Sequence, residues 1–425
     1  MKTLFKNAQL IDPASDKAAP GHLLLEGGRI LEAIWSGSPE TQADETIECE
    51  GMCLAPGIID LGVKVSEPGE RHKESFRTAG QAAAAGGVTT MVTRPDTDPA
   101  IDTPETLEFV RRRANEAALV RVVPMAALTK GRAGREMVEI GFLKDAGAAA
   151  FTDCDRVVAD TKVATRCLSY AKSLGAVVVG HPQDPGLSAG AAATSGAFAS
   201  RLGLPSVSPM AESIGLDRDL GLIEITGAAY HFDQITTARS LAKLNDAKSS
   251  GLDVTAGISI HHLTLNEADI GDYRTFFKVK PPLRAEADRQ AAVAAVASGL
   301  IDIVSSMHTP QSEEEKRRPF EEAASGAVGL ETLLSAALGL YHGGELTLPS
   351  LFRALSLNPA KRLGLEAGHL GRGAPADLVL FDATASNTLD RWAMRSKSKN
   401  TPFDGTSLRG KVKGTWIGGK RVFEA

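Results

Sequence analysis

The sequence has little cysteine, few aromatic residues and no long apolar run, and each scarcity excludes a class of protein. Its four cysteines, at positions 49, 53, 154 and 167, follow neither a zinc-ribbon spacing nor a disulfide framework. No run of about 18 apolar residues marks a membrane span, and the N-terminal segment MKTLFKNAQLID lacks the apolar core of a signal peptide. We therefore expect a cytoplasmic protein whose thiols are reduced.

The numbers of acidic and basic residues are also nearly equal. The chain has 47 Lys and Arg against 52 Asp and Glu, a net charge of −5, and a pI near 6.0. This balance argues against a surface for nucleic acid or for an anionic membrane. With 43% hydrophobic and 23% charged residues among 425, the composition is that of a globular protein with a large core.

Both ends of the chain show short β-type segments. LFKNAQLID, GHLLLEGGRILEAI and ETIECEGMCLAPG lie near the N-terminus, and ADLVLFD and GKVKGTWIGGKRVFEA lie near the C-terminus. The pairs Gly27-Gly28 and Gly418-Gly419 supply the residues of tight turns. We predict that residues 1–54 and 366–425 form one small composite β domain, a β-sandwich built from both chain ends.

Residues 55–365 alternate between strand-like and helix-like segments. Ala-rich helical patterns, several ending in Gly, separate eight strand-like runs. The runs are APGIIDLGVKV, GVTTMVTRPD, VRVVPMAAL, AAAFTD, GAVVVGHP, YHFDQIT, LDVTAGISIHHL and IDIVSSMHTP. Eight repeats favour an α/β fold of the (β/α)₈ TIM-barrel type over a doubly wound open sheet, with the chemistry at the carboxyl ends of the strands.

Two segments interrupt this alternation. The Ala-Gly tract at Ser188–Ser200 is predicted to form a loop and a small helix above the barrel, and Ser312–Phe320 is predicted to form a charged, solvated loop.

Several motifs then carry a resemblance to a known family. GIIDLGVKVSEPG at 57–69 and AAAAGGVTTMVTRPDTDPAID at 82–102 resemble sequences of the long dihydroorotases, in the amidohydrolase superfamily. KVKPPLR, LSLNPAKRLGL and GAPADLVLFD continue the match, which covers nearly the whole chain in order. The resemblance implies a barrel with a small β domain, hydrolysis of a cyclic amide, and zinc as the cofactor.

The positions that carry this chemistry in the family are replaced here. The family has an HxH zinc pair after strand one, an arginine and an asparagine that contact substrate, a histidine after strand six and a catalytic aspartate after strand eight. The corresponding residues are Gly62, Lys64, Ser66, Asp96, Gln234 and Met307, and the methionine before the asparagine is Arg94. Because glycine, ammonium, carboxamide and thioether groups are poor replacements for zinc ligands and a general base, we predict that no zinc is bound and no residue is catalytic.

Other family positions survive as possible remnants of a substrate pocket. Cys154 aligns with the family's bridging aspartate, although a shift of one residue would place Asp153 there. His181, Cys154 and Asp153 form the weaker alternative of a rearranged metal site. The remaining pocket remnants are His181, His262, Lys278, Arg284 and His308.

Lys64 suggests a more specific hypothesis. An ammonium buried without compensation is costly. If Lys64 points into the former metal site, its charge could replace that of zinc, and it should then pair with Asp96 or Asp153.

The resemblance also implies a function and a partner. Zinc-less dihydroorotase homologues in some bacteria assemble with aspartate carbamoyltransferase, and the substitutions are similar to theirs. We predict a catalytically inactive structural subunit for that enzyme, in a homo- or hetero-oligomer, without nucleic-acid or membrane partners. The alternative is an active dihydroorotase, or another cyclic-amide hydrolase with a rearranged metal site.

Overall fold

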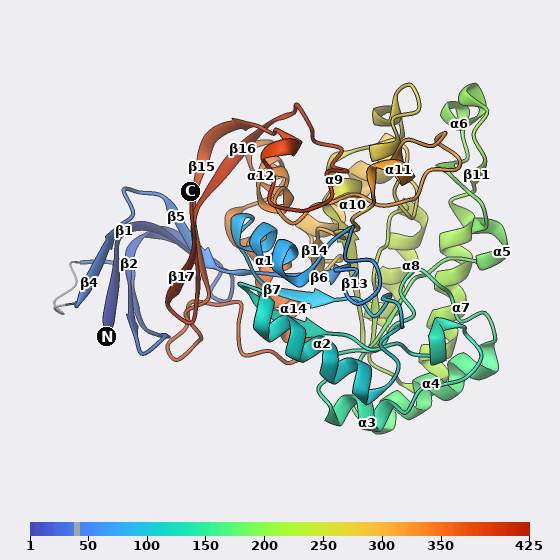
Figure 1. Cartoon of the computed structure of the whole chain (residues 1–425), viewed down its shortest axis with the longest axis horizontal. Coiled ribbons are helices and arrows are strands. Elements are labelled where there is room, and N and C mark those ends of the chain that lie inside the picture. The colour runs from blue at the N-terminus through green and yellow to red at the C-terminus, as the bar shows by residue number, and fades with distance from the viewer. Residues whose placement is uncertain (38–42) are drawn as a thin grey trace.

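A computed structural model describes residues 1–37 and 43–425. The terminal segments form a β-sheet on one side of the molecule, and the barrel with its surrounding helices forms the other (Figure 1). No helix in the described part of the chain is long and apolar enough to cross a membrane.

Both ends of the chain contribute strands to one sheet of eight. Their order is β17-β16-β15-β5-β1-β2-β3, with β4 pairing with β1, and β5 joins the two ends by pairing antiparallel with β15. The strands are β1 (Lys2–Asp12), β2 (Lys17–Glu26), β3 (Arg29–Ile34), β4 (Glu45–Glu48), β5 (Cys53–Pro56), β15 (Leu378–Thr388), β16 (Ser407–Ile417) and β17 (Lys420–Glu424). The hydrogen bonds define a single sheet, and its predicted division into a two-sheet sandwich stays a prediction.

The two Gly-Gly turns predicted from the sequence are formed, and they touch. All four glycines have positive φ, between 53° and 80°, which glycine adopts at little cost. A Cβ on Gly28 would lie 2.6 Å from the carbonyl oxygen of Gly418. The turns therefore require glycine for two reasons: the positive φ angles, and the close contact between the two turns. The core of the sheet is centred on Phe5 and Trp416, whose rings meet edge to face at 5.0 Å.

The barrel strands are parallel and follow the predicted order. They are β6 (Ile58–Val63), β7 (Val88–Thr93), β8 (Arg121–Pro124), β9 (Val178–Gly180), β12 (Tyr230–Phe232), β13 (Val254–Ser259) and β14 (Ile303–Ser305). The predicted fourth strand is reduced to bridges from Phe151 to Ala126 and Val178. It still bonds to both neighbours, because Thr152 N donates to Ala126 O at 2.9 Å and Phe151 N to Val177 O at 3.0 Å.

The ring closes between β14 and β6. Buried Asp60 of β6 accepts hydrogen bonds from the backbone N of Ser306, at 2.8 Å, and from its hydroxyl. Lys64 N donates to His308 O at 2.9 Å just above this contact. Apolar side chains make up much of the barrel interior, and the strand tips carry the groups available for chemistry. These interior residues are Ile59, Leu61, Val92, Met125, Ala150, Val179 and Ile303.

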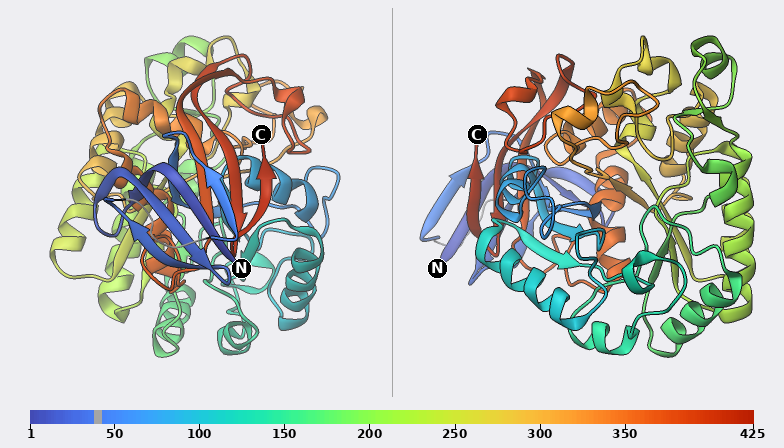
Figure 2. Two further views of the ribbon diagram at one scale, coloured as in Figure 1. Left: turned by 90° about the vertical axis from the view of Figure 1, so that its left-hand side faces the viewer. Right: turned by 45° about the vertical axis from the view of Figure 1, so that its right-hand side comes forward.

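Helices cover the outside of the barrel (Figure 2). The helices of the described residues are α1 (Phe76–Ala85), α2 (Pro104–Ala117), α3 (Ile140–Asp145), α4 (Thr161–Ser173), α5 (Pro185–Ser188), α6 (Ala197–Leu202), α7 (Met210–Thr226), α8 (Ala238–Ser249), α9 (Ile260–Thr264), α10 (Glu286–Ala297), α11 (Glu313–Lys316), α12 (Leu333–His342), α13 (Leu348–Phe352) and α14 (Asn358–Leu363). Among the Ala-rich segments that the sequence predicts as helices, 75–86, 103–118, 161–175, 236–251 and 285–299 form α1, α2, α4, α8 and α10. Hydroxyl or carboxylate caps at Ser75, Thr103, Asp160 and Thr237 begin four of them.

The two interrupting segments are more ordered than predicted. The Ala-Gly tract begins at the last residue of α5 and contains most of α6 and strand β10 (Ala193–Thr194), which pairs with β11 (Ser206–Val207). The predicted solvated loop at Ser312–Phe320 contains α11, capped by Ser312, and the side chain of Lys316 is buried. That prediction is corrected: Lys316 is held in the protein interior because its ammonium donates to the carbonyls of Thr275 at 2.9 Å and Lys278 at 3.3 Å.

Candidate functional site

A partly buried arginine pairs with an aspartate at the mouth of the barrel. Arg94 follows β7, and its Nε and Nη2 donate to the two carboxylate oxygens of Asp96 at 3.2 and 2.8 Å. The side chains of Arg94 and Asp96 are 11% and 6% exposed. Burial opposes the charge of Arg94, but Asp96, with further help from Asp155 and Asp233, holds the pKa of Arg94 above its ordinary value. A permanent positive charge is therefore fixed at the strand tips.

Lys64 adds a second cation to the same carboxylate. Its Nζ lies 3.5 Å from Asp96 Oδ2 and 3.7 Å from Glu70 Oε2, and its side chain is 16% exposed. The hypothesis that Lys64 faces a strand-tip carboxylate is confirmed for Asp96. The sequence did not indicate that Arg94 makes the closer, bidentate contact.

Asp153 is used elsewhere. Its carboxylate accepts hydrogen bonds from the backbone N of Leu128 and Thr129, both at 3.0 Å, and from the Thr129 hydroxyl. Burial raises its pKa against these hydrogen bonds. Its neighbour Cys154 has a φ of 57° and a buried thiol whose pKa is raised to about 12, chiefly by burial. A protonated thiol and an internally bonded carboxylate are poor metal ligands.

Asp155 extends the ionic network to the rim of the barrel. Its Oδ1 lies 3.1 Å from Arg132 Nη2 and 3.8 Å from Arg94 Nη2, and its Oδ2 lies 3.1 Å from Lys280 Nζ. Burial would raise the pKa of Asp155, but Arg94 and Lys280 outweigh it and hold that pKa far below its usual range. The mouth therefore carries alternating cations and carboxylates.

The space left by the missing first-strand ligand is taken by a residue from the last strand. Gly62 has a φ of 95°, and a Cβ there would lie only 2.7 Å from the sulfur of Met307. The two residues line a cavity of about 20 Å³ together with Arg94, Cys154 and Asp233, among others. That volume holds roughly one water molecule. With Met307 in this position, only glycine fits at position 62 without a shift of the Met307 side chain.

A histidine and an aspartate face each other across the tips of β9 and β12. His181 Nδ1 lies 3.1 Å from each carboxylate oxygen of Asp233, and its buried Nε2 has no hydrogen-bond partner. Gln234 donates from Nε2 to Lys280 O at 3.1 Å. The sequence predicts His181 and Gln234 as site positions but does not predict Asp233. The signal that could have indicated Asp233 is its place directly after the strand-like segment YHF, next to Gln234.

His308 is tied to a carboxylate that the sequence prediction also omitted. Its Nε2 lies 3.5 Å from Glu74 Oε2, and both side chains are fully buried. Gly329 N donates to His308 Nδ1 at 3.2 Å, and Ser396 Oγ donates to Glu74 Oε2 at 2.6 Å. Burial opposes ionisation, but the contacts with His308 and Ser396 lower the pKa of Glu74. Through its bond from Ser396, the His308–Glu74 pair anchors the segment after β15 to the barrel.

The other predicted remnants bond within the scaffold. Arg284 pairs with fully buried Glu212 at 3.3 Å. His262 bonds through Nδ1 to Ser259 Oγ at 2.8 Å and through Nε2 to Pro281 O at 3.0 Å. Lys278 donates to Glu321 O at 2.8 Å. Ser66 is buried, and its hydroxyl has no partner.

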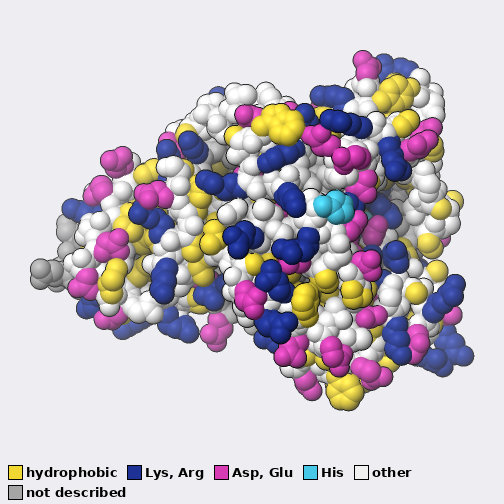
Figure 3. Space-filling model, in the orientation of Figure 1, with side chains coloured by type: hydrophobic (Ala, Val, Ile, Leu, Met, Phe, Trp, Pro, Cys, Tyr) yellow, Lys and Arg dark blue, Asp and Glu magenta, His cyan; other side chains and the backbone are white. Residues whose placement is uncertain are grey.

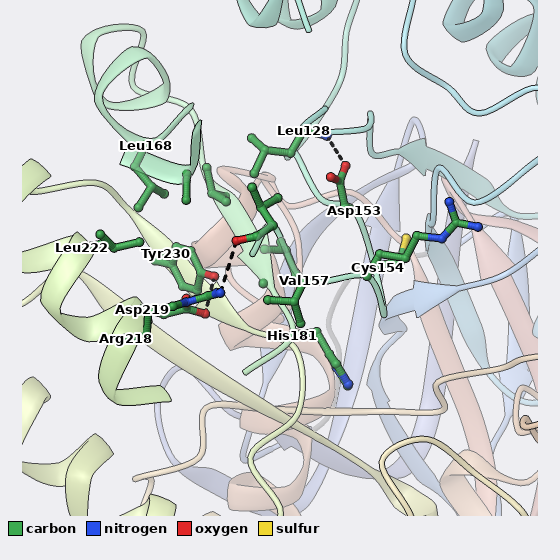
Figure 4. Close-up of a pocket in the computed structure, with 16 residues that line it drawn as sticks. Leu128, Asp153, Cys154, Val157, Leu168, His181, Arg218, Asp219, Leu222 and Tyr230 are labelled. Atoms are coloured by element: carbon green, nitrogen blue, oxygen red, sulfur yellow. Dashed lines mark hydrogen bonds and ion pairs between the residues drawn. The ribbon is translucent and has the colours of Figure 1, made fainter. Parts of the chain in front are cut away.

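A second small cavity lies behind the strand tips. Its volume is about 40 Å³, and it extends from Cys154 and His181 to the Arg218–Asp219–Tyr230 group on α7 and β12. Tyr230 donates to Asp219 at 3.0 Å, and burial raises the pKa of Tyr230 well above its ordinary value. Figure 4 shows the imidazole of His181 turned away from this group. Neither cavity accommodates a cyclic amide substrate of several heavy atoms.

These residues do not fit the zinc centre that the resemblance implies. Such a centre needs about three protein ligands around each ion. Among residues 1–37 and 43–425, no group of three or more His, Cys, Asp or Glu side chains is placed to hold a metal. The alternative set of His181, Cys154 and Asp153 fails because Asp153 bonds to Leu128 and Thr129. The partly buried cations Arg94 and Lys64 would also oppose a nearby divalent ion.

Comparison with known proteins identifies the family. Residues 51–240 match the family described as dihydro-orotase-like, and residues 326–423 match the amidohydrolase family. A dihydroorotase of Syntrophus aciditrophicus is 38% identical over the full length of both chains. The chain belongs to the dihydroorotase family. A dihydroorotase-like protein of Pseudomonas putida, another family relative, is 40% identical over 97% of each chain.

Solved structures support the fold of this dihydroorotase homologue. An L-hydantoinase from Arthrobacter aurescens superposes with a TM-score of 0.90 at 24% identity, covering 99% of this chain and 96% of that one. The TIM-barrel part of the fold prediction is therefore confirmed.

Proposed function

We propose that this dihydroorotase homologue has no dihydroorotase activity and serves as a structural subunit for aspartate carbamoyltransferase. The observation that carries the proposal is the content of the former metal site. The ion network of Arg94, Asp96 and Lys64 stands at the strand tips, and Met307 occupies the space beside Gly62.

Two physical arguments support the loss of activity. Hydrolysis of a cyclic amide in this fold requires an activated water and a group that accepts its proton. The residue at the general-base position, Met307, has a thioether that cannot take up a proton, and the guanidinium of Arg94 cannot release one near neutral pH. His181 and Asp233 retain the geometry of an acid/base pair, with Nδ1 3.1 Å from the carboxylate, but the cavities lined by His181 and by Asp233 have volumes of only about 40 and 20 Å³.

The partner is proposed from the family resemblance and from the preserved scaffold. The chain keeps the family fold over its full length although its chemical groups are replaced, which is expected of a protein whose surface is used. Co-expression with aspartate carbamoyltransferase from the same organism, followed by size-exclusion chromatography, tests this part. We expect one peak containing both proteins, and two separate peaks would contradict the proposed assembly. The Arg94→Met variant is the matched control, because it alters the buried site and should leave co-elution unchanged.

An active dihydroorotase is the second candidate, favoured by the names of the relatives. The relative from Syntrophus aciditrophicus is called a dihydroorotase, and His181 Nε2 has no protein partner. This candidate requires bound metal. Elemental analysis of protein purified in zinc-supplemented medium should find less than one equivalent, and stoichiometric zinc lost in a His181→Ala variant would favour the active enzyme.

A further inference from the structure

The segment Met394–Ser398, between β15 and β16, alternates between buried and exposed residues. Arg395 and Lys397 are exposed, whereas the residues beside and between them are buried. The buried Ser396 fastens the segment to the barrel, because its Oγ donates to Glu74 Oε2 at 2.6 Å. This alternation, in which successive side chains leave the chain on opposite sides, directs both basic side chains to solvent.

The carboxylates that meet this segment lie beneath it. Glu74 is fully buried and accepts a hydrogen bond from Lys397 N at 3.2 Å. Glu331 accepts hydrogen bonds from Arg395 N at 2.9 Å and from Ser396 N at 3.0 Å. Both carboxylates therefore bond to the backbone of the segment, and these bonds leave its basic side chains free to face outward.

The basic groups of the segment have uncharged neighbours. The guanidinium carbon of Arg395 lies 5.1 Å from the ring centroid of Phe423. Lys397 Nζ donates to the carbonyl of Arg71 at 2.8 Å. Since neither contact is with a carboxylate, both side chains keep their positive charge at the surface.

Arginines of the neighbouring loop and helices continue this cationic surface. Arg71 Nε and Arg113 Nη2 lie 3.2 and 3.4 Å from the same oxygen of Glu67. The side chain of Glu67 is 3% exposed, whereas that of Arg71 is 63% exposed. Arg77 is exposed on α1, next to Phe76, whose backbone N donates to the other oxygen of Glu67 at 3.0 Å. One buried carboxylate is thus shared by two arginines, and Arg77 adds a third guanidinium.

These residues form a surface of one sign, which we call the cationic strip. It consists of Arg71, Arg77, Arg113, Arg395 and Lys397. Figure 3 shows Lys and Arg side chains gathered over α1 and α2 in the middle of one face of the molecule. Glu67 and the exposed Glu116 pair with members of the strip, so its cations exceed these carboxylates by three. Because the whole chain has a net charge of −5, the strip is a local reversal of sign.

A hollow opens at one end of the cationic strip. Its volume is about 550 Å³, and it lies where β15, β16 and β17 of the terminal sheet meet α12. Arg395, which belongs to the strip, lines it together with Lys411 and apolar residues such as Met394 and Val412. This volume is within the range of ligand pockets. Trp392, three residues before Arg395, is 61% exposed, and tryptophan and arginine are the residues most enriched where protein interfaces are strongest.

We propose that the cationic strip and the hollow form a docking surface for an acidic, extended segment of a partner protein. Acidic side chains of the segment meet the exposed cations, and an apolar side chain beside them enters the hollow next to Arg395. A nucleic acid is less suited to this surface, because its charges would continue beyond the strip onto a chain of net charge −5 and it has no aliphatic side chain for the hollow. The docking surface goes beyond the proposed function, since it depends neither on carbamoyltransferase nor on the loss of activity.

Fluorescence anisotropy of the full chain with a labelled peptide tests the proposal. The probe is a fluorescein-labelled peptide of ten glutamates followed by two leucines. In 50 mM NaCl we expect saturable binding, and in 300 mM NaCl at least tenfold weaker binding, because exposed ion pairs are screened by salt. The same peptide without the leucines should bind about tenfold more weakly, the effect of burying one leucine side chain.

Two charge-reversal variants locate the binding surface. Arg77→Glu with Lys397→Glu should weaken binding of the leucine-bearing peptide at least tenfold, and it leaves the bonds of Glu67 intact. The matched control is Lys162→Glu with Arg166→Glu, which changes the net charge equally at exposed positions of α4, away from the strip (Figure 1). The control should bind like the wild type, and thermal unfolding should give the same midpoint for both variants.

Several results would overturn the proposal. They are no binding by the wild type, equal loss of binding in the two variants, and equal affinity for the peptides with and without leucine. Tighter binding of a ten-residue oligothymidylate than of the peptide would exclude a protein segment as the preferred occupant. No carbamoyltransferase is present in these measurements, so such a failure leaves the proposed assembly untouched.

Discussion

Replacing Arg94 by methionine, the residue expected from the family resemblance, tests how the ion network at the strand tips is stabilised. The variant keeps an unbranched apolar side chain but removes the guanidinium that donates to Asp96 at 2.8 and 3.2 Å. Asp96, 6% exposed, then retains only Lys64 at 3.5 Å. Removing one partner of a buried ion pair costs about 3–5 kcal/mol, because the other charge stays buried.

The remaining Lys64 contact places the expected loss at the lower end, about 3 kcal/mol. With an unfolding entropy of roughly 2.1 cal/mol/K per residue, this corresponds to a Tm lower by about 3–4 °C. The assay is urea unfolding of a double-mutant cycle: Arg94→Met, Asp96→Leu and the combination. Since the double variant removes both charges, it should be more stable than Arg94→Met alone.

The surface pair Arg317–Glu313 supplies the control. Its guanidinium and carboxylate lie 2.8 Å apart, but the Arg317 side chain is 77% exposed, so Arg317→Met should cost less than about 1 kcal/mol. Equal effects of Arg94→Met and Arg317→Met, or strict additivity of the Arg94 and Asp96 substitutions, would refute the reasoning.

Three further predictions follow from other parts of the molecule. Gly62→His should lower the free energy of unfolding by about 2–4 kcal/mol, because of its φ of 95° and its clash with Met307; in a thermal-unfolding comparison, combining it with Met307→Asp should recover part of the loss. Lys316 has a pKa lowered to about 7 by burial and by nearby Lys278, against 10.5 for an ordinary lysine. Between these values the unfolded chain holds a proton that the folded chain lacks, so this lysine makes the free energy of unfolding rise with pH by up to about 1.4 kcal/mol per unit. Urea titrations at pH 7, 8 and 9 should show that contribution missing in Lys316→Met, and parallel curves for the two proteins would contradict it. Finally, the four cysteines are buried, and the thiol pKa of Cys154 is raised to about 12, so native protein should expose no fast-reacting thiol to Ellman's reagent at pH 8, whereas urea-denatured protein should react at all four.

The elements that the sequence predicted well are those defined by local patterns. Apolar runs mark the barrel strands, and the helices between them begin at recognisable caps such as Ser75 and Asp160. Helix α7 was not among the predicted helices. Its outer face is nearly as apolar as its inner face, so the amphipathic signal on which such predictions depend is missing.

The candidate site was only partly predictable, because its important contacts join distant segments. The resemblance identified Gly62 and Met307 as altered positions, but no local pattern shows that Met307 fills the space over Gly62. The sequence shows Arg94 as a replacement for methionine, but it favours Lys64 as the partner of Asp96, because lysine stands where the family resemblance places a zinc ligand. Side chains from several strands meet at the strand tips, so Arg94, which follows β7, approaches Asp96 more closely than Lys64, which follows β6.

The most direct test of the proposed loss of activity is turnover by pure, zinc-loaded protein, measured in both directions with dihydroorotate and carbamoyl aspartate beside an active member of the family. The account predicts no turnover above the uncatalysed rate while the control enzyme is active. Turnover that a chelator abolishes and zinc restores would contradict it, because the residues around Arg94 and Met307 would then coexist with a working metal centre.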